Sequence, residues 1–310
     1  MRSSGEGAVI VGEAATSEQA QATADIAAAS AGVELADIDG PADAWAASQA
    51  FDRVWGRNAN VGAVLPGEAL IALRHAGGQV TIARRADDGE VVGATVGFVG
   101  RDHDTGQLFV HSHVTGVLPE AAGGGIGRAL KWYQRWWCLE RGIEQVRWTY
   151  DPLVRRNAVF NLLGLGAQAV AYEQDVYGAM ADAVNAGLPT DRLLAVWDLG
   201  SPRTRAAAEG RGAAPDLDGL RHAGAETWLA VGDDEEPQLT PTEASRRLVQ
   251  VPPDIERLRQ RDRSAATAWA EAIRGTLGHA VAAGERITGV TRDGWYVLAR
   301  PAGVTELADR

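Results

Sequence analysis

The sequence has few residues of several kinds, and each shortage excludes a class of protein. Among 310 residues there is a single cysteine, Cys138, so no disulfide can form within the chain and no cluster of thiolates can hold a metal ion. We expect Cys138 to act as a small apolar residue in a helix. Such a chain is compatible with a reducing compartment.

Long apolar runs are missing as well. No stretch of the sequence reaches the roughly 20 apolar residues that a membrane-spanning helix needs. The N-terminus also lacks a basic segment followed by an apolar stretch and a cleavage site. We therefore expect a cytoplasmic protein with no membrane partner.

Positive charge is scarce relative to negative charge. The chain has 30 Lys and Arg against 41 Asp and Glu, which gives a net charge of −11. Proteins whose main task is to bind nucleic acid or an anionic membrane need a net basic surface, so no nucleic acid is expected as a partner. A hydrophobic content of 45% is enough to bury a core, in one large domain or two smaller ones.

Residues 1–32 differ in amino-acid composition from the rest of the chain. They are rich in Ala, Ser, Gly and Glu and have no aromatic residue, which predicts a mobile leader with some helical content. From Val33 a short strand, a turn at Gly40-Pro41 and a helix follow. The helix spaces its large apolar residues as a buried face requires, and these are Trp45, Phe51, Val54 and Trp55.

Strand and helix patterns alternate over the next 120 residues. Two β-rich runs flank the turn signal Asp87-Asp88-Gly89 and predict an antiparallel hairpin over 78–86 and 90–100. Further strands are expected at 107–118, 144–151 and 192–199, and helices at 126–141 and 155–167. This order predicts a mixed α/β fold with one crossover.

The last third of the chain is predicted to form an addition to this α/β core. Residues 201–244 carry Gly, Pro and the acidic run Asp233–Glu236, which predicts a linker or surface excursion. Residues 245–310 hold a helix pattern at 263–284 and two alternating runs around Arg292-Asp293-Gly294. We expect this part to form a helix and a β-hairpin packed on the core.

A glycine-rich turn follows the strand that carries two histidines, in the segment 111–131, "HSHVTGVLPEAAGGGIGRALK". No Gly-Lys-Ser/Thr follows, so the turn is not a Walker loop, and the glycine spacing fits a Rossmann fingerprint poorly. Residues without a Cβ before a helix let successive N–H groups converge on an anion at the positive end of the helix dipole. The turn therefore predicts a pyrophosphate site, or in the simpler interpretation a loose connection.

The stretch "VLPEAAGGGIGRAL" resembles the acetyl-CoA signature of the GCN5-related N-acetyltransferase (GNAT) superfamily. Val117, Pro119, Gly125 and Gly127 match the signature, whereas Ala122 stands where the family usually has Arg or Gln. The resemblance covers roughly residues 33–199, is strongest from 108 to 199, and is closest to a bacterial branch of predicted acetyltransferases. It implies a GNAT core over 33–200, with a mixed, mostly antiparallel sheet flanked by helices.

The resemblance also implies how a coenzyme binds. The backbone of Val117 would bond the pantetheine arm of coenzyme A. The backbone amides of the turn would cradle its pyrophosphate, and these belong to Gly123, Gly124, Gly125, Ile126, Gly127 and Arg128. Acetyl-CoA or another acyl-CoA is the expected co-substrate, and no metal is expected. Asn157 and Asn161 lie four apart on one helix face, where they could bond coenzyme or substrate amides, or face solvent.

His111 and His113 lie two apart on a predicted strand, so both imidazoles point from the same face. Histidine is the side chain best suited to exchange protons near neutral pH. A His-x-His pair precedes the coenzyme loop at similar spacing in the arylalkylamine N-acetyltransferases, and this resemblance implies a base relay. Two other interpretations stay open: a pair satisfied within the sheet, and a metal site with His103 as a third ligand.

The general acid is less clear than the base. The resemblance places Leu162 where the superfamily often has a tyrosine that protonates the leaving thiolate. Tyr177 and Tyr150 are the candidate replacements, or else packed aromatic residues. Asp151 could orient a substrate ammonium or act as a second base, and with Pro152 beside it, it is also a typical turn residue.

We predict an acyl-CoA-dependent acyltransferase that moves an acetyl or other acyl group to a small-molecule amine by direct attack, with both substrates in one cleft. Two alternatives remain because a fold does not fix its chemistry. One is an enzyme with changed chemistry, such as O-acylation, thioester hydrolysis or decarboxylation. The other is a non-catalytic module that binds acyl-CoA. A homodimer is compatible with the sequence.

Overall fold

Seven strands form the first of two sheets. The computed structural model describes residues 16–57, 62–178 and 189–300. The strands are β1 (Val33–Asp37), β2 (Gln79–Arg85), β3 (Val91–Arg101), β4 (Leu108–Val117), β5 (Gln145–Tyr150), β6 (Gln168–Glu173) and β7 (Arg192–Asp198). They lie in the order β1-β2-β3-β4-β5-β7-β6, and every neighbouring pair is antiparallel except β4 with β5. The predicted α/β fold with a mixed, mostly antiparallel sheet is confirmed.

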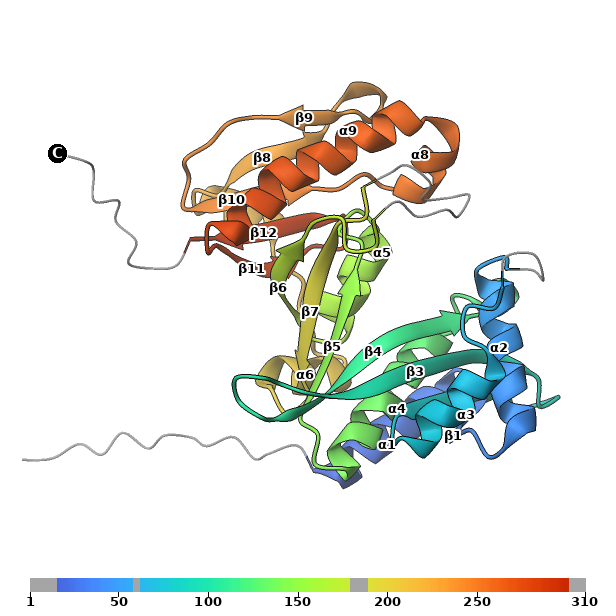
Figure 1. Ribbon diagram of the computed structural model, residues 1–310. Coiled ribbons are helices and arrows are strands. Elements are labelled where there is room, and N and C mark those ends of the chain that lie inside the picture. The colour runs from blue at the N-terminus through green and yellow to red at the C-terminus, as the bar shows by residue number, and fades with distance from the viewer. Residues whose placement is uncertain (1–15, 58–61, 179–188, 301–310) are drawn as a thin grey trace, which may run out of the picture.

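Helices cover both faces of this sheet (Figure 1). One face carries α4 (Ile126–Glu140), with α1 (Ser17–Ser30) lying along it, and the other carries α2 (Pro41–Val54) and α3 (Gly67–His75). Two glycines on neighbouring strands show this division. A Cβ added to Gly93 would meet side chains of α4, whereas a Cβ added to Gly116 would meet Trp55, at the end of α2. A short helix, α5 (Arg155–Ala158), continues into a π-helical turn, η2 (Val159–Gly164).

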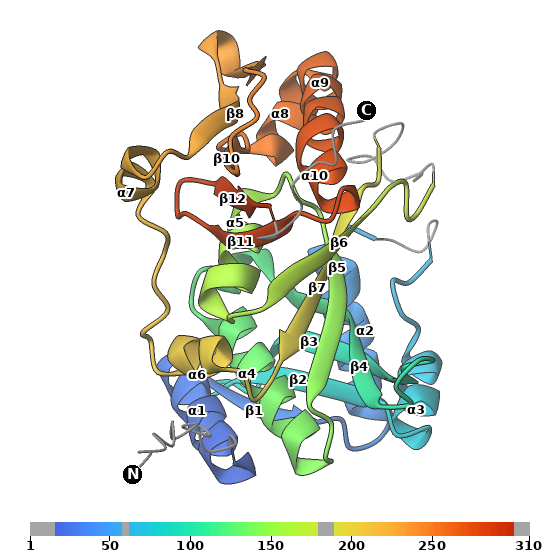
Figure 2. The ribbon, with the colours of Figure 1, turned by 90° about the vertical axis from the view of Figure 1, so that its left-hand side faces the viewer.

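The prediction of a mobile leader is wrong for residues 16–32, because α1 is a capped and packed helix. The Thr16 side chain accepts a hydrogen bond from the Gln19 backbone N–H, and the Gln19 side chain accepts one from the Thr16 N–H, both at 3.2 Å. Ala20 and Ala24 are buried where α1 and α4 lie side by side (Figure 2). Residues 1–15 of that prediction lie outside the described residues.

The predicted buried face of α2 is only partly correct. Phe51 is fully buried, but Trp45 and Trp55 are 46% and 47% exposed. Each of these two rings covers a glycine of another element, Gly67 for Trp45 and Gly116 for Trp55, where a Cβ would come within 2.8 to 2.9 Å of the ring. The two indoles therefore pack on one side and leave the other side open.

The second sheet is built from the last hundred described residues. Its strands are β8 (Glu226–Val231), β9 (Pro237–Leu239), β10 (Arg246–Gln250), β11 (Arg286–Val290) and β12 (Trp295–Ala299), in the order β11-β12-β10-β8-β9. The helical elements of this region are α6 (Pro202–Ala208), α7 (Leu217–His222), α8 (Ile255–Arg261), α9 (Arg263–Ile273), η4 (Arg274–Gly278) and α10 (His279–Ala282), with a one-turn 3₁₀ segment at η3 (Asp233–Glu235). Another such segment, η1 (Pro119–Ala121), lies between β4 and α4. The prediction of a linker at 201–244 is therefore wrong, whereas the predicted hairpin at the end of the chain is present as β11 and β12.

The two sheets share one hydrophobic core. Buried residues of α4, β5 and β7 belong to the same cluster as Leu229, Trp269 and Tyr296 of the second region. Polar links reinforce this contact: Arg259 Nη2 lies 2.6 Å from Asp151 Oδ2, and the Tyr296 hydroxyl donates to the Pro152 carbonyl at 2.9 Å. The second region thus holds the end of β5 in place. No helix within the described residues is long and apolar enough to cross a membrane.

Breaking the Asp151–Arg259 pair should destabilise the chain. Both side chains are mostly buried, at 14% and 9% exposed, so the variant Arg259→Met leaves a buried carboxylate unpaired and should lower the free energy of unfolding by about 3 kcal/mol. Asp151→Asn in the same background should recover part of the loss. Urea unfolding of the single and double variants measures both effects.

The matched control is Arg261→Met on the same helix. Its ion pair with Glu235 is about half exposed, at 51% and 45%, so its loss should cost less than about 1 kcal/mol. Equal losses at positions 259 and 261 would contradict a buried link between the two sheets.

Candidate functional site

The site lies where β4 and β5 separate. These two parallel strands pair only at Val110 with Val146 and at His111 with Arg147. Beyond that point β4 continues beside β3, while β5 follows β7 in another direction (Figure 1). We call the diverging segments, residues 112–117 of β4 and 148–150 of β5, the β4–β5 fork, and the first residues after the pairing its apex.

Backbone groups of β4 face into the fork. The Leu118 N–H donates to the Val92 carbonyl of β3 at 2.9 Å, and Val117 pairs with Gly93. Since backbone groups alternate sides along a strand, the N–H and C=O of Val117, and those of Thr115, point away from β3 toward the fork. An extended ligand with amide groups could pair with this strand edge. The role of the Val117 backbone in binding pantetheine stays a prediction.

The glycine turn connects β4 to the N-terminus of α4. Gly125 occupies the N-cap position with a φ of 89°, and Gly123 has a φ of 85°. These values lie in the left-handed region, which glycine adopts without a Cβ penalty. Since no side-chain cap bond is made at this end of α4, the amides of Ile126, Gly127 and Arg128 begin the helix as unsatisfied donors. The turn therefore presents free backbone donors at the N-terminus of α4, and the pyrophosphate site there stays a prediction.

A cavity of about 340 Å³ adjoins this turn. Gly124, Gly125 and Arg128 line it from the α4 side, together with residues of α1, Trp132 and Ala208. The Arg128 guanidinium donates to the Ala207 carbonyl of α6 at 3.2 Å. The Trp132 Nε1 is buried and has no hydrogen-bond partner among the described residues. The cavity thus lies against the first turn of α4, where the free backbone donors are.

The structure brings His111 and His113 together on the face of β4 away from α4. Their ring centroids lie 6.1 Å apart, and the His113 ring meets Phe98 edge-on at 5.2 Å. The register between β3 and β4 shifts beside His113, so the strand bulges there. Burial lowers the pKa of both imidazoles below the ordinary 6.5, and His113 and Lys131 lower the pKa of His111 further. Both rings are therefore neutral near pH 7 and able to accept a proton.

The two candidate tyrosines differ in accessibility. Tyr177 is 53% exposed, its hydroxyl lies 3.4 Å from the Thr149 hydroxyl at the end of β5, and the Arg192 guanidinium covers its ring. Tyr150 is buried, its hydroxyl makes no hydrogen bond of normal geometry within the described residues, and burial raises its pKa well above 10. Tyr177 is thus the accessible hydroxyl near the fork.

Both carboxylate oxygens of Asp151 are engaged in this structure. One carboxylate oxygen pairs with Arg259 and the other accepts the Leu153 N–H at 2.9 Å. The carboxylate therefore fixes the turn after β5 and links the two regions. Leu162 is 4% exposed in the core, while Asn157 is half-buried on α5. Within the described residues no group of three His, Cys, Asp or Glu could hold a metal ion.

Sequence reasoning missed Lys131, which lies beneath the apex of the fork with 5% of its surface exposed. It is the only lysine of the chain, because the other 29 of the 30 basic residues are arginine. That count was the signal available in the sequence. Helical spacing alone favours apolar residues at the buried positions of α4, whereas Lys131 and Gln134 are buried against polar partners on the sheet, Ser112 and Gln79.

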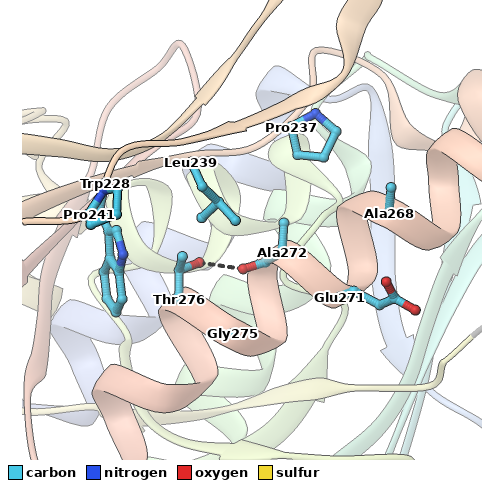
Figure 3. A pocket seen from close by; sticks show the side chains of 9 residues that line it. All are labelled: Trp228, Pro237, Leu239, Pro241, Ala268, Glu271, Ala272, Gly275 and Thr276. Atoms are coloured by element: carbon cyan, nitrogen blue, oxygen red, sulfur yellow. Dashed lines mark hydrogen bonds between the residues drawn. The ribbon is translucent and has the colours of Figure 1, made fainter.

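Another cavity, of about 430 Å³, lies in the second region (Figure 3). Its walls are apolar apart from Thr276 and the carboxylate of Glu271, and they come from β8, the segment around β9, and α9 with η4: Trp228, Pro237, Leu239, Pro241, Ala268, Glu271, Ala272, Gly275 and Thr276. The Thr276 hydroxyl is already bonded to the Ala272 carbonyl at 2.7 Å. None of these residues belongs to the fork or the glycine turn.

One family model and several solved structures are similar to parts of this chain. The family model described as an acetyltransferase (GNAT) domain matches residues 19–152. A search of curated proteins gives no match.

Several solved structures are similar in fold. They include yncA of Salmonella typhimurium with its cofactor acetyl-CoA (19% identity over 60% of this chain and 98% of that chain, TM-score 0.42) and an acetyltransferase of the GNAT family from Streptococcus pneumoniae (15%, 53% and 98%, TM-score 0.41). A third is the ribosomal-protein-S18-alanine N-acetyltransferase of Escherichia coli (13%, 55% and 95%, TM-score 0.41). Similarity at this level says nothing about the substrate of this chain.

The lowered pKa values of the histidine pair are directly measurable. In an NMR titration His111 and His113 should both show midpoints below 6.5. In the variant His113→Gln the His111 midpoint should rise, because a neighbouring positive charge no longer opposes its protonation. Midpoints at or above 6.5 for both residues of the pair would contradict the burial described here.

Proposed function

We propose that the chain is an acyl-CoA-dependent acyltransferase that moves an acetyl or other acyl group to the amine of a small molecule. The match of residues 19–152 to the acetyltransferase (GNAT) family model supports this proposal. The observation that carries this proposal is the placement of three features along one strand. The apex of the fork lies in the middle of β4, the histidine pair lies at the apex, and the glycine turn follows the end of the strand.

The chain's own groups fit an acyl-CoA. The free backbone edge at Thr115 and Val117 suits the two amides of a pantetheine arm, because a strand edge pairs with any extended amide chain. The left-handed glycines at 123 and 125 expose amides at the positive end of α4, which suits a pyrophosphate. When bound there, an acyl-CoA supplies an acyl group activated as a thioester.

Acyl transfer by direct attack needs one proton removed and one supplied. The amine nitrogen forms a bond to the thioester carbonyl carbon, the carbon–sulfur bond breaks, the amine gives up a proton and the sulfur takes one up. His111 and His113, neutral near pH 7 because burial lowers their pKa, are the proposed acceptors of the amine proton. The accessible hydroxyl of Tyr177 is the proposed route by which a proton reaches the sulfur.

The residues around the histidines favour an acceptor amine that carries an uncharged or apolar group. Phe98 touches His113, and Trp55 covers Gly116 further along the same strand face; these aromatic side chains are 38% and 47% exposed. Exposed rings that line one strand face offer a flat apolar surface next to the proposed base. An amine with an adjoining apolar group suits this surface.

The coenzyme part of the proposal is tested at the glycine turn. Gly125→Ala places a side chain at a φ of 89°, which should strain the N-cap by about 1–2 kcal/mol and weaken acetyl-CoA binding about tenfold. Isothermal titration calorimetry with acetyl-CoA measures the affinity.

The matched control is Gly142→Ala at the other end of the same helix. Gly142 also has a left-handed φ, of 68°, and a Cβ there meets nothing within 4 Å. This variant should lose similar stability and keep its acetyl-CoA affinity. No binding of any CoA ester by the unaltered protein, or equal affinity losses in the two variants, would contradict a coenzyme site at the turn.

The chemical part is tested by turnover with a panel of small amines. The variant carrying His111→Gln and His113→Gln should lose about 100-fold or more in kcat, the usual scale for general-base loss, and should bind acetyl-CoA as before. Mass spectrometry of the products identifies the acylated amine. Release of free coenzyme A without an acylated amine would instead favour hydrolysis. Acylation of peptides alone would replace the small molecule with a protein acceptor.

A further inference from the structure

Lys131 is held at the apex of the fork by three partners. Its Nζ lies 2.7 Å from Ser112 Oγ on β4 and 3.0 Å from Gln134 Oε1 on α4. It also lies 4.2 Å from the centre of the Trp148 ring on β5. Ser112 and Trp148 are the residues that directly follow the last paired positions of β4 and β5. The ammonium group therefore contacts both strands at the point where they part.

A chain of hydrogen bonds leads from this ammonium to Asp37 through the core. Gln134 Nε2 donates to Gln79 Oε1 at 2.8 Å. Gln79 Nε2 in turn donates to Thr81 Oγ1 at 3.1 Å, and Thr81 Oγ1 donates to Asp37 Oδ1 at 2.7 Å. Every member donates in the direction of Asp37, as the two ends require, because an ammonium can only donate and a carboxylate can only accept.

The three middle members of this chain, Gln79, Thr81 and Gln134, are fully buried. Burying a lysine without compensation would be costly, and an aligned chain of dipoles that ends on a carboxylate reduces that cost. A charge placed in the core with this much support, in a chain that otherwise uses only arginine, indicates a specific role for an ammonium at the fork.

The contact with Lys131 also determines what Ser112 can do. A lysine ammonium has no lone pair, so the Ser112 oxygen must be the acceptor of the 2.7 Å bond. The Ser112 hydroxyl proton is then left for another acceptor, and within the described residues no hydrogen bond from it is found. A hydroxyl that accepts from a cation is also a stronger donor than an isolated one.

We propose that Lys131 is a positioning residue of the acyl-transfer site: its ammonium polarises Ser112, whose hydroxyl donates to the negative charge that develops on the thioester at the apex of the fork. This inference rests on the proposed function. As the carbon–nitrogen bond forms, the carbonyl electron pair moves onto oxygen, and as it returns, the carbon–sulfur pair leaves with the sulfur. Ser112 and Lys131 keep their protons throughout, and the proton taken up by sulfur balances the one that the amine released.

The ionisation of Lys131 gives this role a pH dependence. Burial lowers the pKa of Lys131 to about 7, and Cys138 on the same helix acts in the opposite direction. Among the groups that face it, His111 on β4 is titratable, Trp148 on β5 is not, and Asp37 on β1 is reached only through the hydrogen-bonded chain. The ammonium is present below this pKa and is lost as pH rises through it, so stabilisation of the developing charge declines on the alkaline side.

Two substitutions test the inference in the full-length protein. Lys131→Met, which keeps the length of the side chain, and Ser112→Ala should each lower kcat about 100-fold, the scale of one lost donor to a developing charge. The KM for acetyl-CoA should change less than about threefold, because the interaction strengthens only in the transition state. Lys131→Met should also abolish the fall of kcat above about pH 7, and Lys131→Arg should restore part of kcat without that fall.

Arg221→Met is the control variant, because it also removes a positively charged side chain that packs against a tryptophan ring. The Arg221 guanidinium lies 5.2 Å from the Trp295 ring in the second region, away from the fork, so kcat and its pH profile should be unchanged. Thermal unfolding is measured for every variant. If Lys131→Met does not fold, the kcat of Ser112→Ala tests the inference instead.

A measurement independent of turnover uses the single lysine. Protein labelled with ¹³C-lysine has one ε-carbon signal, which should titrate near pH 7 and move to a higher midpoint when a non-transferable thioether analogue of acetyl-CoA is bound. A midpoint near 10 with no response to the analogue would overturn the inference. The inference would also be overturned if the unaltered protein is active and the Lys131 and Ser112 variants keep both its kcat and its fall of kcat at high pH. The proposed function would remain valid in that case. Failure of the unaltered protein to bind the analogue would reject the proposed function itself.

Discussion

The break in the pairing of β4 with β5 is the constraint on which the site depends. Had the two parallel strands continued side by side, the backbone groups of Thr115 and Val117 would have been satisfied within the sheet. Because the strands part after His111, β4 presents a free edge at one end and a pair of neutral imidazoles at its apex. The glycine turn and the buried Lys131 then add positive electrostatic character at the two ends of the same short segment.

The second region helps to hold the fork open. It contributes no residue to the β4 edge, but its side chains fix the far end of β5 through the Asp151–Arg259 pair and the bond from Tyr296 to the Pro152 carbonyl. The shared hydrophobic core extends this support to β6 and β7. One half of the fork is therefore anchored by α4 and the other by the last third of the chain, which gives that third a physical role in the site.

The sequence was informative where local physics decides the structure. The amphipathic pattern of α4, its glycine N-cap and the alternation in β2, β3 and β4 depend on near neighbours, so these elements and the histidine pair could be predicted. The structure of α1 and of residues 201–244 depends on partners that are distant in the sequence. The alanine-rich α1 is stabilised by packing on α4, and β8 is stabilised by pairing with β10. The short edge strand β6 was missed for the same reason. The ion pair of Asp151 and the burial of Lys131 are likewise long-range facts that spacing along the chain cannot reveal.

Amide hydrogen exchange with and without acetyl-CoA tests the central claim most directly, because it reports on the backbone donors themselves. The account predicts slower exchange at Thr115 and Val117 and across the turn, residues 123–128, when acetyl-CoA is bound. It predicts no change in β8 or in η4, which border the cavity of the second region. Unchanged exchange along β4 and the turn, or protection confined to that other cavity, would contradict an acyl-CoA site at the β4–β5 fork.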